Sequence, residues 1–162
     1  MNNNERINNI LHHRDYIKNV RILEEYERNR EFCRHDLNHF LDVCRIAYII
    51  NLEENLKYPK DIIYAIGLIH DIGRVLEYER GVPHNKASIE IGIPILKDSK
   101  FNEEEIKIIC SAIDNHRIHK EDKTSLESLI YRSDKLSRGC FNCKAIDKCY
   151  WSEEKKNKNI MY

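Results

Sequence analysis

Turn-forming residues are scarce in this chain, and their scarcity limits the folds that it can adopt. Only five glycines and three prolines occur among 162 residues, too few for the many tight turns of a sheet-rich fold. Apolar residues instead recur at three- and four-residue intervals, as in Leu37, Phe40, Leu41, Cys44, Ala47 and Tyr48. This period is typical of helices with one buried face. The sequence therefore predicts an all-α, single-domain bundle of about six helices.

Capping and breaking residues set the expected helix limits. Asp36 and Asn102 are candidate N-caps, Pro59 suits a first helical position, and Gly139 ends the last helix. A bend or an interruption is expected near 92–94, where glycine and proline occur. The predicted helices cover residues 5–29, 36–51, 59–73, 84–96, 102–116 and 124–138, the last with Thr124 and Glu127 as its capping pair.

The balance of charge excludes several classes of partner. The 27 basic and 27 acidic residues give a formal net charge of zero, which argues against a duplex nucleic-acid surface and a polybasic membrane anchor. No apolar run is long enough to span a bilayer, and the N-terminus has no secretory signal, so a cytoplasmic location is expected. Residues 1–139 are predicted to form the helical domain, and residues 140–162 a cysteine-bearing appendage that does not fold independently.

Potential metal ligands interrupt the apolar faces of these helices. Such groups are costly in a core unless they are paired or metal-bound, and helical bundles build metal sites from side chains that converge from facing helices. One such residue would be weak evidence, but the chain has six on successive predicted helices: His39, His70, Asp71, His84, His116 and Asp134.

This ordered set resembles the HD superfamily of metal-dependent phosphohydrolases, whose signature is a histidine, a His-Asp pair and a final aspartate on separate helices. The local contexts Ile69-His70-Asp71-Ile72-Gly73 and Ser133-Asp134-Lys135-Leu136-Ser137 also match, and the resemblance covers roughly residues 35–138. It implies that His39, His70, Asp71 and Asp134 hold one ion. It further implies that Asp71 bridges to a second ion held by His84 and His116, as in the binuclear branches of the superfamily.

The donor set also indicates which metals are expected. Four imidazoles and two carboxylates suit iron or manganese, and also zinc, nickel or cobalt, better than magnesium or calcium. The resemblance implies a metal-dependent phosphohydrolase acting through a metal-activated water on a small phosphorylated substrate, such as a nucleotide. Asp71 would then be catalytic as well as a ligand, and the adjacent cations Arg74, Arg117 and Lys135 are candidate phosphate binders.

Three choices stay open in the sequence. The same ligands serve di-iron oxygenases of the HD fold, and a non-catalytic metal- or redox-sensing module is a third interpretation. His35-Asp36 is a second His-Asp pair; since Asp36 suits a helix cap, we favour His39 as the ligand and leave His35 as a neighbour of the site. The oligomeric state cannot be predicted.

A cysteine cluster follows the last predicted ligand. Cys140, Cys143 and Cys149 form a C-x2-C-x5-C pattern, which in a reducing compartment indicates a zinc ion or an iron–sulfur cluster more than disulfides. A fourth ligand is missing from this segment, and Cys33, Cys44, Cys110 or a histidine are all candidates. The lysine- and asparagine-rich tail beyond the cysteines is expected to fray.

Overall fold

A computed structural model of the chain describes residues 3–162, and every regular element in that range is helical. This confirms the all-α prediction. No helix within that range has the length and apolar character needed to cross a membrane. The elements are α1 (Asn3–Leu11), α2 (Arg14–Tyr26), α3 (Leu37–Glu53), α4 (Lys60–Ile69), α5 (Arg74–Arg80), α6 (His84–Asp98), α7 (Glu103–Asn115), α8 (Leu126–Leu136) and two 3-10 helices, η1 (Cys140–Asn142) and η2 (Ile146–Lys148).

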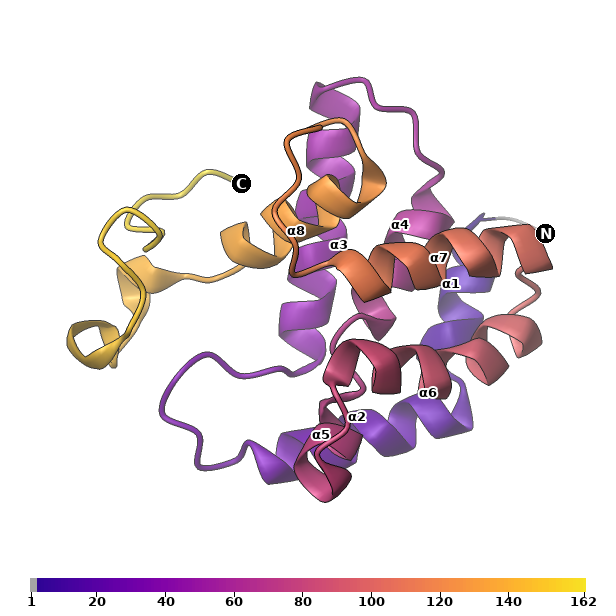
Figure 1. Cartoon of the computed structure of the whole chain (residues 1–162), viewed down its shortest axis with the longest axis horizontal. Coiled ribbons are helices and arrows are strands. Elements are labelled where there is room, and N and C mark those ends of the chain that lie inside the picture. The colour runs from indigo at the N-terminus through magenta and orange to yellow at the C-terminus, as the bar shows by residue number, and fades with distance from the viewer. Residues whose placement is uncertain (1–2) are drawn as a thin grey trace.

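Helix α4 lies at the centre of the bundle. It packs against α1, α3, α6, α7 and α8, while α2 and α5 lie against α6 at one end (Figure 1). Its side chains Ile63, Ile66 and Ile69 are fully buried. A helix enclosed on most sides needs apolar residues all round, and this explains the isoleucine-rich sequence before His70.

The first predicted helix is divided in two. Residues 5–29 form α1 and α2, which are separated at His12 and His13. The His13 backbone is extended, and its Nδ1 atom accepts a hydrogen bond from the Asp15 backbone N–H at 3.2 Å. A side chain that satisfies a free backbone donor favours a new helix start. The single-helix prediction for this segment was therefore wrong.

Helix α5 was not predicted. Its seven residues are too few to show a helical period. It ends at Gly81, which has a positive φ of 69°, the left-handed conformation that suits glycine after a helix. The preceding helix stops at Ile69 rather than near Gly73, so His70–Gly73 form a tight connection between α4 and α5.

Two further boundaries differ from the prediction. Helix α6 runs without interruption through Pro94 to Asp98. The cap of α8 is Ser125, whose hydroxyl accepts the Ser128 N–H at 3.2 Å, rather than Thr124. The Thr124 hydroxyl instead donates to the Asp122 carboxylate at 2.6 Å. The predicted N-caps Asp36 and Asn102 are confirmed.

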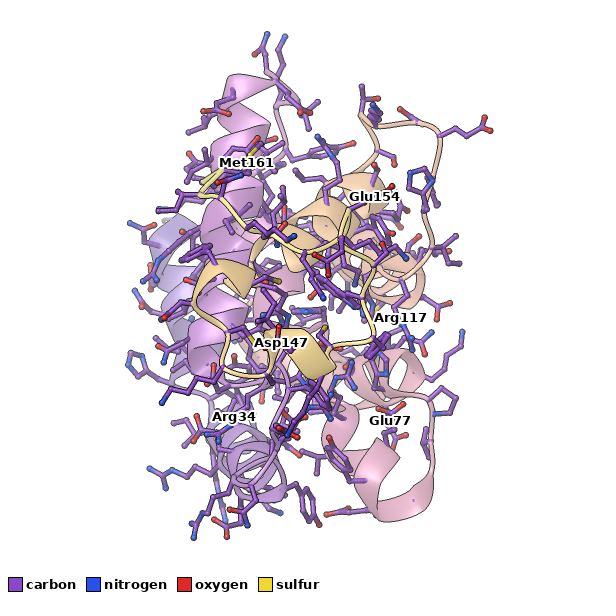
Figure 2. The ribbon with its side chains drawn as sticks, turned by 90° about the vertical axis from the view of Figure 1, so that its left-hand side faces the viewer. Arg34, Glu77, Arg117, Asp147, Glu154 and Met161 are labelled. Carbon is purple, nitrogen blue, oxygen red and sulfur yellow. The ribbon has the colours of Figure 1, made fainter. Side chains whose placement is uncertain are left out.

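The C-terminal segment packs back onto the bundle rather than fraying. The Asn157 side-chain amide donates to the carbonyls of Lys135 (2.7 Å) and Arg138 (2.9 Å). The Asn157 carbonyl accepts the Phe141 N–H at 3.0 Å. Figure 2 shows the segment crossing one face of the molecule, with Asp147 placed between Arg34 and Arg117 in that view. The tail is therefore anchored at the C-terminal end of α8.

Candidate metal centre

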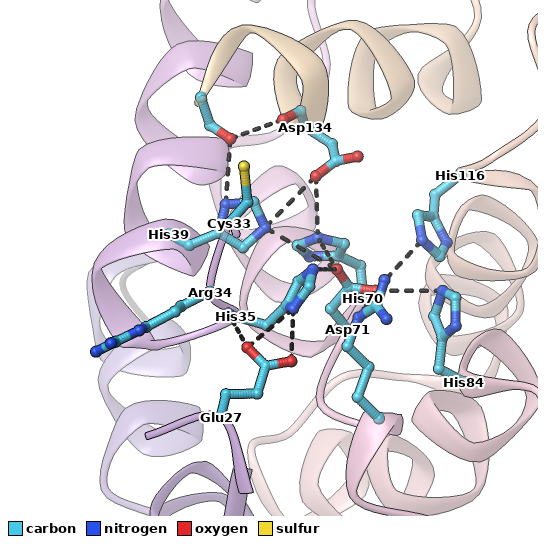
Figure 3. A network of polar contacts seen from close by, with 12 residues as sticks. Glu27, Cys33, Arg34, His35, His39, His70, Asp71, His84, His116 and Asp134 are labelled. Atoms are coloured by element: carbon cyan, nitrogen blue, oxygen red, sulfur yellow. Dashed lines mark hydrogen bonds and ion pairs between the residues drawn. The ribbon is translucent and has the colours of Figure 1, made fainter. Parts of the chain in front are cut away.

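The bundle brings all six predicted ligands to one buried place. His39 comes from α3, His70 and Asp71 follow α4, His84 begins α6, His116 follows α7, and Asp134 lies in α8. Each is at most 6% exposed. They form two sets in which one ligand atom from each residue lies within 4.8 Å of the others. The first set is His39, His70, Asp71 and Asp134, and the second is Asp71, His84 and His116 (Figure 3).

Asp71 belongs to both sets because its two oxygens face different histidines. Its Oδ2 atom lies 3.5 Å from His70 Nε2 and 4.0 Å from His39 Nε2. Its Oδ1 atom lies 3.3 Å from His84 Nε2 and 3.6 Å from His116 Nε2. The two oxygens of this carboxylate therefore face the two ligand sets separately.

Hydrogen bonds orient all four histidine rings in the same way. The Nδ1 atom of each ring faces an acceptor, namely Ser137 Oγ for His39 (3.1 Å), Gly67 O for His70 (2.8 Å), Glu77 Oε1 for His84 (3.1 Å) and Ile113 O for His116 (2.6 Å). The Ser137 hydroxyl donates its own proton to the Asp134 carbonyl at 2.7 Å, so it accepts from His39. Protonation at Nδ1 leaves each Nε2 lone pair facing the centre, as metal-binding histidines require. That of His39 also accepts a hydrogen bond from the Arg138 guanidinium at 3.2 Å.

Electrostatics favours the neutral form of His39 and His84 and the ionised form of both carboxylates. Burial, reinforced by the guanidinium of Arg138, lowers the pKa of His39 to about 2, and burial also lowers the pKa of His84. Burial alone would raise the pKa of Asp71 and of Asp134, but neighbouring groups, His70 foremost, hold both well below their usual range. Burial opposes the charged form of His70 as well, yet the two carboxylates raise its pKa.

Several buried atoms of the centre have no hydrogen-bond partner. They are His70 Nε2, His84 Nε2, Asp71 Oδ1 and Asp134 Oδ1. Buried polar atoms without partners are costly and uncommon in folded proteins. Two carboxylates and four Nε2 lone pairs that converge in this way fit two divalent transition-metal ions, in agreement with the donor set predicted from the sequence.

A protein-family model matches most of this helical region. The family model of the HD domain matches residues 36–139, a range that contains all six ligands. The chain belongs to the HD domain family. HD domains bind divalent metals, and the buried histidine and aspartate sets of this HD domain are compatible with that property.

Similar proteins extend the comparison. An uncharacterized protein of Clostridium beijerinckii is 49% identical over 98% of this chain and 99% of its own length. Ribonuclease Y of Mycoplasma capricolum subsp. capricolum is 27% identical over 75% of this chain, which corresponds to only 22% of that enzyme. The crystal structure of a predicted HD superfamily hydrolase from an uncultured Thermotogales bacterium superposes with a TM-score of 0.62 and 22% identity, covering 91% of this chain and 82% of the other. The last comparison supports the fold.

Two of the predicted phosphate binders contact the ligands. Arg74 Nε lies 3.3 Å from Asp71 Oδ1, and Lys135 Nζ lies 2.5 Å from Asp134 Oδ2. Arg117 is exposed and lines the same cavity of about 370 Å³ that opens beside the centre. The three predicted cysteine ligands, Cys140, Cys143 and Cys149, line an adjoining cavity.

A His–Glu pair extends the site beyond the six ligands. His35 Nε2 lies 3.5 Å from Asp71 Oδ2, and its Nδ1 atom lies 2.8 Å from Glu27 Oε1. Glu27 also accepts the His35 backbone N–H at 2.6 Å and the Tyr78 hydroxyl at 2.9 Å. The four-residue offset from His39 left a place beside the site open for His35 without assigning it, and the sequence contained no signal for Glu27. The pair orients one nitrogen of His35 toward the reacting region.

We expect Glu27→Gln to lower kcat by about 10- to 100-fold, the usual cost of losing a group that orients a histidine. The metal content should stay unchanged, because Glu27 is not within either ligand set. Steady-state kinetics together with elemental analysis checks both results. Glu24→Gln, an exposed position in the last turn of α2 three residues before Glu27, is the control. An unchanged kcat, or loss of metal, would contradict the positioning role of Glu27.

Proposed function

We propose that this HD domain protein hydrolyses a phosphodiester or phosphoanhydride bond of a nucleotide-type substrate through a metal-activated water. The observation that carries the proposal is the shared carboxylate of Asp71, which faces two separate ligand sets in a buried centre. This is the arrangement that two-metal phosphohydrolases require. The similarity of one region to ribonuclease Y supports phosphodiester chemistry.

The residues of the chain have distinct tasks in this reaction. His39, His70 and Asp134 would hold one ion, His84 and His116 the other, and Asp71 both. When bound, the ions supply Lewis-acid activation of water and neutralise charge on the phosphate. The hydrogen bonds at Nδ1 fix the histidine rings before metal arrives, so little reorganisation is needed.

The cavity beside the centre has the chemistry of a nucleotide site. Five cations line it, which suits a polyanionic substrate: Arg30, Arg74, Arg117, Lys135 and Arg138. Four aromatic residues share the same walls, which suits stacking of a base: Phe32, Tyr131, Tyr150 and Trp151. Its volume of about 370 Å³ lies within the usual range for small-molecule sites. We therefore infer a nucleotide whose phosphate lies near Arg74 and Lys135 and whose base lies near the aromatic side chains.

Tyr150 offers a direct test of base stacking, because it lines the cavity and is 87% exposed. Base–aromatic stacking is worth about 1–3 kcal/mol, so Tyr150→Ala should raise KM for a nucleotide at least about fivefold. KM for a small alkyl phosphoester, which has no base, should not change. Tyr162→Ala, an aromatic position outside this cavity, is the control. Equal effects on both substrates would contradict base stacking at Tyr150.

The decisive assay for the reaction is hydrolysis without oxygen. Protein loaded with Mn²⁺ is incubated anaerobically with a dinucleotide, a nucleoside triphosphate and a nucleoside monophosphate, and the products are separated by chromatography. We expect hydrolysis of at least one substrate and its loss in Asp71→Asn. A second assay is run in air with the iron-loaded protein. Oxygen consumption there, with no hydrolysis of any substrate in either assay, would instead favour an oxygenase.

A further inference from the structure

Four cysteines from two distant segments surround one cavity next to the metal centre. Cys33 comes from the connection between α2 and α3, whereas Cys140, Cys143 and Cys149 belong to the C-terminal segment. All four line the same cavity of about 290 Å³, and all are free thiols. The fold therefore supplies a fourth cysteine to the C-x2-C-x5-C pattern, about 100 residues away in sequence.

The other candidates for the fourth position lie elsewhere. Cys44 is fully buried in the apolar core, where its Sγ atom donates to the Tyr64 carbonyl at 3.5 Å. Cys110 lies in α7 and packs against the core. His39 does line the cysteine cavity, but its Nε2 atom faces Asp134 and its Nδ1 atom faces Ser137. Cys33 is thus the residue that completes the cysteine set.

The C-terminal segment winds around the cavity in successive tight turns. The Cys143 N–H donates to the Cys140 carbonyl (3.1 Å), the Ile146 N–H to the Cys143 carbonyl (3.3 Å), and the Cys149 N–H to the Ile146 carbonyl (3.3 Å). These three-residue steps include η1 and η2. These turns of the local backbone bring the thiols of Cys140, Cys143 and Cys149 to the same cavity.

The four thiols are not gathered as closely as the ligands of a single ion would be. Four thiolates on one zinc ion lie about 2.3 Å from it, and hence within about 4 Å of one another. Among residues 3–162, the sets of three or more ligand atoms within 4.8 Å comprise only histidines and aspartates, and no three of these sulfurs meet that limit. The four thiols line a cavity of about 290 Å³, which leaves room between them for a group larger than one ion.

We infer that Cys33, Cys140, Cys143 and Cys149 bind a [4Fe–4S] cluster, one thiolate to each iron. Four cysteines are the usual ligands of such a cluster, and a cluster separates their sulfurs more widely than one ion does. Arg138 lines the cavity and supplies positive charge to this anionic group. Burial raises the pKa of the Cys33 thiol, and the guanidinium of Arg138 opposes that rise.

The cluster site shares a wall with the substrate cavity. Cys33, Cys149, Arg138 and Trp151 line both cavities. A cluster would therefore link the segment that carries His35 to the tail that carries Tyr150. It would hold both against the metal centre without contacting the reacting atoms.

Anaerobic reconstitution of the full-length protein with ferrous iron and sulfide tests this inference. Acid-labile sulfide is the diagnostic quantity, because the histidine and aspartate centre binds metal ions but no sulfide. We expect about four sulfides per chain in the wild-type protein and visible absorption typical of a cluster. Cys33→Ser should lose most of both, and Cys110→Ser should lose neither. Circular dichroism verifies that each variant is folded.

Two results would overturn the inference. One is a wild-type protein that takes up metal at the cysteines without sulfide, for example a single zinc ion. The other is a folded Cys33→Ser protein with the full sulfide content of the wild type. Neither result depends on enzymatic activity, so failure of the cluster and failure of the proposed hydrolase function are distinguishable.

Discussion

Asp71→Asn is expected to abolish hydrolysis and to reduce metal binding at both positions of the centre. Asparagine has nearly the same shape, but its amide nitrogen cannot bind a cation, and Asp71 is the one residue common to both ligand sets. The change also removes a negative charge that lies opposite five histidines. Because removal of a shared ligand affects both ions, we expect kcat to fall at least about 1,000-fold, or roughly 4 kcal/mol of transition-state stabilisation.

Anaerobic steady-state assays and elemental analysis of the same preparation measure both effects. The matched control is Asp42→Asn, since Asp42 is a half-buried residue of α3 that pairs with Arg45 outside the ligand sets. It should retain wild-type activity and metal content. An Asp71→Asn protein with wild-type turnover would refute the assignment of this site, whatever its metal content.

Gly73→Ala is expected to be the most destabilising single substitution near the centre. A Cβ atom at this position would lie 2.1 Å from the Ser88 nitrogen and 2.3 Å from the His84 carbonyl oxygen. Both are backbone atoms of α6, so the whole helix must move away. The Gly73 N–H also donates to the Ser88 hydroxyl at 2.8 Å, a bond that this displacement would break. We expect a loss of about 3 kcal/mol or more in the free energy of unfolding.

Urea unfolding of the metal-free protein measures this loss, and Gly139→Ala is the control. A Cβ atom at Gly139 meets nothing closer than the Phe141 ring at 3.6 Å, so its effect should be small. Because α6 begins with His84, Gly73→Ala should also weaken the second metal position more than the first. A variant as stable as Gly139→Ala would show that α5 and α6 do not pack as closely as the structure has them.

The length of the apolar repeat in each helix explains which parts of the fold could be predicted. Helices α3 and α7 each have several turns of apolar period and a recognisable cap, and the sequence located both. Helix α5 has only two turns. The break between α1 and α2 depends on a histidine cap, an unusual choice. Short elements and rare caps carry too little local information for such predictions.

The convergence of the six candidate ligands was predictable because polar side chains are costly on apolar helix faces and these follow a recognisable order. Glu27 and Cys33 were not assigned for a different reason. Both belong to the end of α2 and the connection after it, where no periodic pattern fixes which way a side chain points. Tertiary packing alone brings Glu27 to His35 and Cys33 to the C-terminal cysteines.

Metal stoichiometry is the most direct test of the binuclear centre. Metal-free Cys33→Ser/Cys140→Ser/Cys143→Ser protein, in which only one thiol of the cysteine site remains, is titrated anaerobically with Mn²⁺ by calorimetry and checked by elemental analysis after dialysis. We expect this protein to bind two ions per chain. Adding His84→Ala and His116→Ala should reduce the number to one, whereas adding His12→Ala, at an exposed histidine, should leave it at two. A single ion in the triple cysteine variant, unchanged when His84→Ala and His116→Ala are added, would contradict a binuclear centre shared by Asp71.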